Sequence, residues 1–155
     1  MKIQWDKLLK SIAVPLAVGG VSALISMDAM QSFGNLNQPP LSPPAWLFPI
    51  AWSILYVLMG IASYLVSVSD KEARAKTALT VYGIQLFFNF FWSIIFFSFE
   101  AYLLAFIWLV LLWILIIVTA YLFYGINKTA GYLMIPYILW VTFAGYLNFA
   151  IYLSN

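Results

Sequence analysis

The side chains that could do chemistry in this 155-residue chain are aromatic rings and carboxamides, because the chain contains neither His nor Cys. Without Cys there is no disulfide, no thiolate nucleophile and no thiolate metal site. Without His there is no Ser–His triad, no imidazole base and no proximal His for haem. We therefore expect no metal site and no conventional acid–base catalysis.

Three apolar stretches carry aromatic and amide side chains at helical spacing. In the stretch from residue 77 to residue 99, four residues recur every three or four positions and so share one helical face: Gln85, Asn89, Trp92 and Phe96. The same spacing in an earlier stretch gives Phe48, Trp52 and Tyr56, and in the last stretch Trp140, Ala144, Leu147 and Asn148. Each stripe is typical of a helix that turns its rings toward a bundle interior.

Trp52, Asn89 and Trp140 are the strongest candidates for a binding site, since they belong to different helices at similar depth. Two indoles and a carboxamide would converge on a cavity for a large, flat, apolar ligand. The Asn89 amide is costly inside an apolar span unless it has a partner, which we expect in the ligand or in an indole N–H. The alternative is ordinary helix packing, with Trp and Tyr at the headgroup level.

Membrane spans are the elements that must position these residues. Apolar residues make up 65% of the chain and charged residues 8%, against about 45–50% and about 25% in soluble domains. A globule of this length has too little interior for so much apolar surface, which excludes a soluble enzyme. We predict an all-α polytopic membrane protein, a single domain over residues 1–155, with five spanning helices at 8–27, 46–68, 77–99, 101–124 and 130–153.

The charges are sorted between the two sides of this five-span arrangement. The N-terminus and the loops at 70–76 and 125–129 hold all seven cations, whereas the other side holds Asp28 and Glu100 and no cation. By the positive-inside rule the N-terminus is cytoplasmic and the C-terminus outside, in a multi-pass protein of the cell membrane. The net charge of +2 then reflects topology, and we expect membrane lipid and no nucleic acid as a partner.

The connection from residue 28 to residue 45 holds four of the seven prolines. All four lie in the run from Asn37 to Pro44, which cannot be helical and has little backbone freedom. The connection is longer than two neighbouring helices need, so we interpret it as a lid over the outer mouth of the bundle. The alternative is a stiff connector.

Several of these residues belong to longer motifs on three spans. The first motif is Pro43-Pro44-Ala45-Trp46 followed by Pro49, Trp52, Leu55-Tyr56 and Gly60. The second is Gln85-Leu86, Asn89-Phe90-Phe91-Trp92 and Phe96-Phe97, and the third is Pro136-Tyr137, Trp140, Phe143-Ala144 and Leu147-Asn148. In content and order they resemble the translocator protein family (TspO/MBR), which includes tryptophan-rich sensory proteins and peripheral benzodiazepine receptors.

This resemblance implies a five-helix bundle, commonly a homodimer, with a cavity that opens toward the first loop. Family members bind protoporphyrin IX and drugs of the isoquinoline carboxamide and benzodiazepine types, and some are credited with a light- and oxygen-dependent breakdown of protoporphyrin. Carried over by motif, the ligand-binding residues are Phe48, Ala51, Trp52, Tyr56, Asn89, Phe90, Trp140, Ala144 and Leu147. The first helix matches less well and adds Ser22 and Ile25. Trp52 and Trp140 are also the candidates for catalysis.

The sequence departs from the family pattern at three places. The cholesterol motif of animal members has Phe149 at its Tyr position and no following cation, so we do not expect cholesterol binding. The first loop has Ser32-Phe33 and Gln38-Pro39 where a Trp-Tyr pair and Lys-Pro are usual. Thr80 and Ile84 replace the small residues that pack some dimers.

Three functions remain open at this stage. The first is a receptor-like protein that binds tetrapyrroles and aromatic carboxamides in a cavity within the bundle. The second is an enzyme that degrades bound porphyrin photo-oxidatively, with porphyrin as ligand or substrate and no other cofactor. The third is a carrier or sequestering protein for tetrapyrroles or other hydrophobic ligands. Energy-coupled transport is disfavoured, because no ionisable side chain lies deep within a span.

Overall fold

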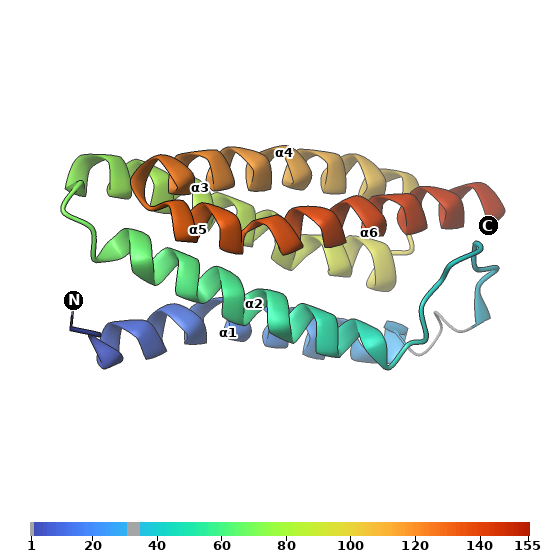
Figure 1. The fold of residues 1–155 in the computed structure, drawn as a ribbon. Helices are drawn as coiled ribbons and strands as arrows, with labels where there is room; N and C mark the ends of the chain where they lie inside the picture. The colour runs from blue at the N-terminus through green and yellow to red at the C-terminus, as the bar shows by residue number, and fades with distance from the viewer. Residues whose placement is uncertain (1, 31–34) are drawn as a thin grey trace.

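The chain forms a bundle of long helices in the computed structural model, which describes residues 2–30 and 35–155 (Figure 1). The elements are α1 (Trp5–Met30), α2 (Leu47–Ser67), α3 (Glu72–Ser93), the π-helix η2 (Ile94–Ser98), α4 (Tyr102–Ile126), α5 (Lys128–Leu133) and α6 (Ile135–Ser154). Five helical units are long and apolar enough to cross a membrane, with α3–η2 and α5–α6 each forming one span. The prediction of an all-α, five-span membrane protein is confirmed.

The span boundaries differ from the predicted ones mainly where charges lie near helix ends. The third span was expected at 77–99, but α3 already begins at Glu72. The charged cluster therefore forms the first turns of a helix and not a loop, since long charged side chains at a helix end can reach water. Similarly, α1 extends from Trp5 to Met30 and exceeds the predicted 8–27 at both ends.

The predicted loop at 125–129 is reduced to one residue, Asn127, between α4 and α5. Its backbone is extended (φ −148°, ψ 116°), which breaks the helix, and its side chain accepts a hydrogen bond from the backbone N–H of Ala130 at 3.1 Å. Asn127 thus ends α4 and caps the N-terminus of α5. The last span breaks again at Met134, with Pro136 in the first turn of α6, where a missing N–H costs little.

The two ends of the bundle carry different charges. The N-terminus, the α2–α3 connection and the α4–α5 junction lie at one end, which we call the cationic end (Figure 1). It holds all seven Lys and Arg residues of the chain: Lys2, Lys7, Lys10, Lys71, Arg74, Lys76 and Lys128. The C-terminus, the α1–α2 connection and the η2–α4 turn lie at the opposite end, which we call the acidic end because its charged residues are Asp28 and Glu100.

The packing core lies around α4, which has no charged residue and buries Leu109, Leu112, Ile116 and Phe123 almost completely. By contrast, α1 buries only Pro15, Ser22 and Ser26 and stands at the edge of the bundle. It packs closely on α2 at Gly60, where a Cβ atom would lie 2.6 Å from the Cα of Ile12. The bundle is therefore dense near α4 and looser between α1, α2 and α6, where the cavity described below is found.

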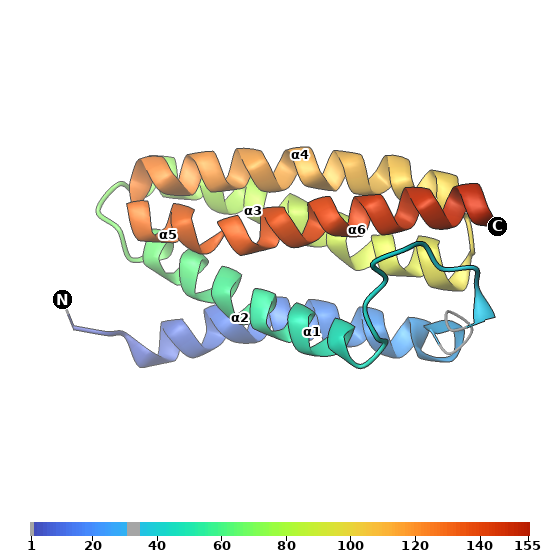
Figure 2. The same ribbon diagram turned by 45° about the vertical axis from the view of Figure 1, so that its right-hand side comes forward.

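The proposed lid at 28–45 is described in part. Residues 28–30 belong to α1, and 31–34, which include the Ser32-Phe33 departure, lie outside the described residues. The segment 35–46 crosses the acidic end beside α6 (Figure 2). Asn37 exchanges hydrogen bonds of 3.2–3.3 Å with Ser154 and Asn155, and the Tyr146 hydroxyl donates to the Pro40 carbonyl at 2.6 Å. The segment is tied to α6, and its role as a lid stays a prediction.

Candidate functional site

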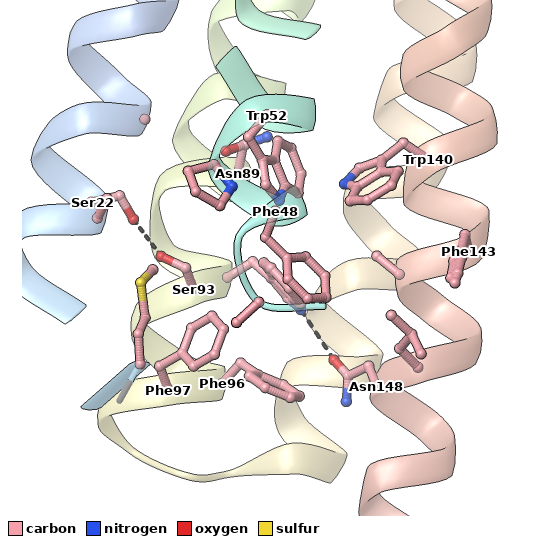
Figure 3. A pocket seen from close by; sticks show the side chains of 18 of the residues that line it. Ser22, Phe48, Trp52, Asn89, Ser93, Phe96, Phe97, Trp140, Phe143 and Asn148 are labelled. Carbon is pink, nitrogen blue, oxygen red and sulfur yellow. Dashed lines mark hydrogen bonds between the residues drawn. The ribbon is translucent and has the colours of Figure 1, made fainter. Parts of the chain in front are cut away.

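A partly open cavity of about 290 Å³ lies between α1, α2, α3–η2 and α6, in the half of the bundle toward the acidic end. Its walls are mainly aromatic and apolar, as Figure 3 shows. The lining consists of Gly19, Ser22, Ala23, Met30, Ala45, Phe48, Pro49, Trp52, Tyr56, Asn89, Trp92, Ser93, Phe96, Phe97, Trp140, Phe143, Ala144, Leu147, Asn148 and Ile151. Ala23, Ala45 and Pro49 are exposed, so the cavity opens where α1 ends and α2 begins.

Trp52 is the centre of the aromatic wall. Its indole stacks on Tyr56 with ring centroids 5.6 Å apart and an interplanar angle of 27°. It also lies 6.3 Å from Trp92 and 6.4 Å from Trp140, the latter edge-on at 87°. A ring held by rings from three helices has little freedom, so Trp52 presents a fixed indole to the cavity.

Trp140 forms the opposite wall on α6. Phe48 meets it edge-on at 6.0 Å, and Phe143 stacks on it at 5.8 Å with an interplanar angle of 10°. Trp52 and Trp140, from two helices, both line the cavity, and their role in ligand binding stays a prediction. Between such walls a flat aromatic ligand can stack face to face or edge to face.

The amide of Asn89 is held by tyrosines in a chain of hydrogen bonds across α2, α3 and α6. The Tyr56 hydroxyl donates to Asn89 Oδ1, Asn89 Nδ2 donates to the Tyr137 hydroxyl, and that hydroxyl donates to Gln85 Oε1, each at 2.7 Å. The partners of this amide in the structure are tyrosine hydroxyls from two neighbouring helices and not an indole N–H. A ligand as a further partner of Asn89 stays a prediction.

Four further polar residues of the lining are also paired within the protein: Ser22, Trp92, Ser93 and Asn148. The Trp92 indole N–H donates to Asn148 Oδ1 at 3.1 Å, and Asn148 Nδ2 donates to the Tyr102 carbonyl at 2.8 Å. The Ser22 hydroxyl on α1 donates to the Phe90 carbonyl at 2.7 Å and contacts the Ser93 hydroxyl. These bonds fix the cavity walls, and they fasten α1 to α3.

The indole N–H of Trp140 is the exception. Among the buried polar side-chain atoms of the described lining, Nε1 of Trp140 alone has no hydrogen-bond partner. In Figure 3 this nitrogen points toward the side of the cavity where Trp52 lies. An unpaired buried donor costs free energy of about 1–3 kcal/mol. The aromatic wall of the cavity therefore contains a buried indole donor without a partner in the protein.

Eight of the eleven residues expected to bind ligand line the cavity, and three do not. The eight are Ser22, Phe48, Trp52, Tyr56, Asn89, Trp140, Ala144 and Leu147. Ile25 is 55% exposed on the outer face of α1, and neither Ala51 nor the Phe90 side chain belongs to the lining. The Phe90 backbone still contributes, since its carbonyl accepts the Ser22 hydrogen bond.

The structure adds lining residues that the expected set lacks. Trp92, Phe96 and Asn148 stand on the helical stripes noted in the sequence, so their spacing contained the signal. Phe97 joins Phe96 in the wall because η2 is a π-helix, in which the Phe99 N–H bonds the Ile94 carbonyl at 3.1 Å. The wider turn changes the register after Ile94, which an α-helical period cannot anticipate.

The arrangement suits recognition better than acid–base or metal chemistry. No charged side chain lines the cavity, and the described residues contain no group of three Asp or Glu side chains able to hold a metal ion. What the site offers is ring surface, the indole N–H groups of Trp52 and Trp140 and a fixed shape. It can hold a flat, largely apolar ligand.

Comparison with known proteins gives consistent matches over most of the chain. The model of the TspO/MBR family matches residues 11–153. The chain is 37% identical to the tryptophan-rich protein TspO of Chlorobaculum tepidum over 146 residues, which are 93% of this chain and 92% of that protein. It is 34% identical to the tryptophan-rich sensory protein of Cereibacter sphaeroides over 149 residues, covering 96% and 91% of the two chains.

The chain also matches an animal protein at lower identity. The chain is 30% identical to the translocator protein of Bos taurus over 130 residues, covering 83% of this chain and 77% of that protein. The resemblance stated from the motifs is thereby confirmed. From the family model, which spans nearly the whole chain, and from these relatives, it follows that the chain belongs to the TspO/MBR family.

Proposed function

We propose that the chain is a membrane receptor-like protein that binds flat, largely apolar aromatic ligands in this cavity. The ligand classes are isoquinoline carboxamides, benzodiazepine-type compounds and porphyrins such as protoporphyrin IX. The observation that carries the proposal is the partly open cavity with aromatic walls, in which the indole N–H of Trp140 is buried and unpaired. Membership of a family whose animal relative is named a translocator protein supports a receptor- or transporter-like role.

A bound ligand would lie against the indoles of Trp52 and Trp140, which contact each other edge-on with ring centroids 6.4 Å apart. Its ring faces would stack on Trp52 and Phe143, and one carbonyl or ring nitrogen would accept the Trp140 hydrogen bond. The cavity volume of about 290 Å³ is at the lower end of the ~300–1,000 Å³ typical of ligand pockets. A two- or three-ring carboxamide fits this space, whereas a porphyrin is larger and would extend through the open side.

Removing the unpaired donor tests this proposal. In Trp140→Phe the hydrogen bond to a carboxamide is lost, and a bond worth ~0.5–1.5 kcal/mol corresponds to roughly a 2- to 12-fold weaker Kd. A phenylisoquinoline without the carboxamide should lose less affinity, because it has no acceptor for that bond. Binding is followed by quenching of tryptophan fluorescence in nanodiscs.

Trp113→Phe is the matched control, because the Trp113 indole N–H already donates to Thr142 on the outer surface of the bundle. This variant should bind both ligands as the wild type does. If Trp140→Phe weakens both ligands equally, or neither, the indole N–H is not the recognition group and the proposal fails.

A second candidate function, photo-oxidative breakdown of bound porphyrin, is favoured by the ring contacts of Trp52. Light-excited porphyrin would take an electron from the indole, and the porphyrin radical anion would add O₂ at a methine bridge. Return of one electron from this adduct to the indole radical cation restores the indole and leaves a neutral porphyrin–O₂ adduct, in which cleavage of the O–O bond and of the adjoining carbon–carbon bond opens the ring as two carbonyls. Trp92, Trp140, Tyr56 and Tyr137 all have ring centroids within 5.6–6.4 Å of Trp52, so the electron deficit could be shared among rings. Trp52 and Trp140 are the proposed participants.

The membrane orientation follows from the charged ends. We propose that the cationic end faces the cytoplasm in the cell membrane, which places the N-terminus inside and the C-terminus outside. We also propose a homodimer. The family resemblance is the basis for this proposal, since Thr80 and Ile84 on the exposed face of α3 are not the small residues that pack some dimers.

A further inference from the structure

The opening of the cavity lies among side chains that face the membrane. Ala23, Ala45 and Pro49 line the cavity and are exposed, so they mark its opening. Their sequence neighbours Leu24 and Ile50 are large, apolar and exposed as well, and they belong to two of the helices that are long and apolar enough to cross a membrane. The opening therefore leads from the cavity into the hydrocarbon of the bilayer.

Hydrocarbon fills this interior better than water does. The Asn89 amide and the Trp92 indole are hydrogen-bonded within the protein, and most of the remaining lining is aromatic or aliphatic. A buried water needs about 2–4 polar partners, which such walls do not supply. A hydrocarbon chain needs none, and it gives the lining the dispersion contacts that a void lacks.

The size and position of the cavity fit one acyl chain of a phospholipid. A methylene group takes up about as much space as a water molecule, ~30 Å³, so the cavity of about 290 Å³ holds on the order of ten of them. Trp46, next to the opening residue Ala45, is 66% exposed, and Trp residues at span ends lie at the level of the lipid headgroups. A phospholipid can keep its headgroup at this level and pass one chain through the opening.

We propose that one acyl chain of a membrane phospholipid enters this opening and occupies the cavity of the ligand-free protein, and that an aromatic ligand displaces it. Occupation by the chain goes beyond the proposed binding function, and displacement of the chain rests on that function. A hydrocarbon chain has no acceptor for the Trp140 N–H, so this donor stays unpaired beside it. A ligand with a carbonyl near Trp140 makes a hydrogen bond that the chain cannot make, which favours the exchange.

The probe for this proposal is a phosphatidylcholine with a photoreactive diazirine near the end of one acyl chain, mixed into nanodiscs of unlabelled phosphatidylcholine. Light converts the diazirine into a carbene with loss of N₂, the carbene inserts into a C–H bond that it contacts, and peptide mass spectrometry locates the label. Labels are expected at Ala144 and Leu147, which line the cavity and are 8% and 5% exposed, too little to be reached from outside the bundle. A saturating isoquinoline carboxamide should reduce these labels at least fivefold and leave labels at the exposed residues Leu103 and Ile107 of α4 unchanged.

A substitution at the opening tests the route of the chain. In Ala23→Phe a ring narrows the opening, and the labels at Ala144 and Leu147 should fall at least threefold. The matched control is Leu24→Phe, at the next residue of α1 and outside the lining, which should leave these labels unchanged. No effect of Ala23→Phe would overturn entry at this place.

A fatty acid that carries the same diazirine tests the source of the chain. If the fatty acid labels the cavity and the phosphatidylcholine does not, the occupant is not a phospholipid chain and the proposal is overturned.

The outcomes separate this inference from the proposed binding function. If the cavity takes no label from the phosphatidylcholine although fluorescence quenching shows that the carboxamide binds, the lipid proposal fails and the binding function stands. Labels that persist while the carboxamide is bound would also overturn it, because chain and ligand would then not share one space. If the cavity is labelled and no carboxamide binds, the binding function fails and occupation by the chain stands.

Discussion

Two adjacent glycines of α1 should respond oppositely to the same substitution. A Cβ atom at Gly19 would lie 2.1, 2.5 and 2.8 Å from three ring atoms of Tyr56, whereas a Cβ at Gly20 would meet nothing within 4 Å. Carbon atoms in contact prefer about 3.5–4.0 Å. In Gly19→Ala the Tyr56 ring must therefore move by more than ~1 Å, and nothing has to move in Gly20→Ala.

The size of the effect follows from what Tyr56 holds. Overpacking costs ~1–3 kcal/mol, and the displaced ring also loses its 2.7 Å hydrogen bond to Asn89, worth ~0.6 and up to ~1.7 kcal/mol in a membrane protein. We expect Gly19→Ala to lower the free energy of unfolding by about 2–4 kcal/mol. Gly20→Ala should be neutral or stabilise by up to ~1 kcal/mol, since Ala favours a helix over Gly.

Unfolding in mixed micelles with increasing SDS measures both variants, and a ligand titration follows the cavity. Since Trp52 stacks on Tyr56, Gly19→Ala should also weaken aromatic ligand binding, while Gly20→Ala should not. The double variant Gly19→Ala/Tyr56→Ala should be no less stable than Tyr56→Ala alone, because the clash has gone. If Gly19→Ala proves as harmless as Gly20→Ala, the packing of Tyr56 on α1 is not as described.

Three more predictions concern named side chains. Asn89→Leu removes the hydrogen bonds to two tyrosine hydroxyls and should lower the free energy of unfolding by ~1–3 kcal/mol. Tyr56→Phe removes only one of these bonds and should lower it less. If SDS unfolding shows Tyr56→Phe to be the less stable variant, the hydrogen-bond network is not as described. Asn127→Ala removes the α5 cap and should cost ~1 kcal/mol, with faster hydrogen exchange in α5 but not in α2. Trp52→Phe and Trp140→Phe should slow the loss of protoporphyrin absorbance under light in air; unchanged rates with normal porphyrin binding would rule out the tryptophan mechanism.

The five-helix membrane architecture could be predicted because long apolar stretches alternate with charged positions along this chain. Five uncharged stretches separated by charged positions leave little freedom in the number of spans. The exact ends could not be predicted in the same way, because Glu72 and Arg74 are compatible with either a loop or the first turn of a helix. The outcome depends on whether their side chains can reach water, which is a tertiary property.

The residues of the candidate site could be predicted from the sequence where they recur at the spacing of one helical face. Spacing identified Trp52, Asn89 and Trp140, and all three line the cavity. Spacing does not say which neighbour satisfies a buried amide, and so the pairing of Asn89 with Tyr56 and Tyr137 was missed. Partners of this kind depend on rotation of each helix and on side-chain length, which no single helix specifies.

The unpaired indole of Trp140 connects stability with ligand recognition. Within a membrane, an unpaired buried donor has no water to bind, so the empty protein bears a cost of about 1–3 kcal/mol. A ligand with an acceptor near Nε1 removes this cost, and a ligand of the same shape without one does not. The Asn89 amide and the Trp92 indole of the described lining are paired within the protein, so they do not add to this difference between the two ligands.

The same argument gives a last prediction, in which stability and affinity change in opposite directions. Benzothienylalanine incorporated in place of Trp140 keeps the fused rings and lacks the N–H. The empty protein should then become more stable by up to about 1–3 kcal/mol, because the unpaired donor has gone. Carboxamide binding should weaken, while binding of an aromatic ligand without an acceptor should not. A variant that loses both stability and affinity would show that this N–H has a structural partner in the protein, and that the donor is not reserved for a ligand.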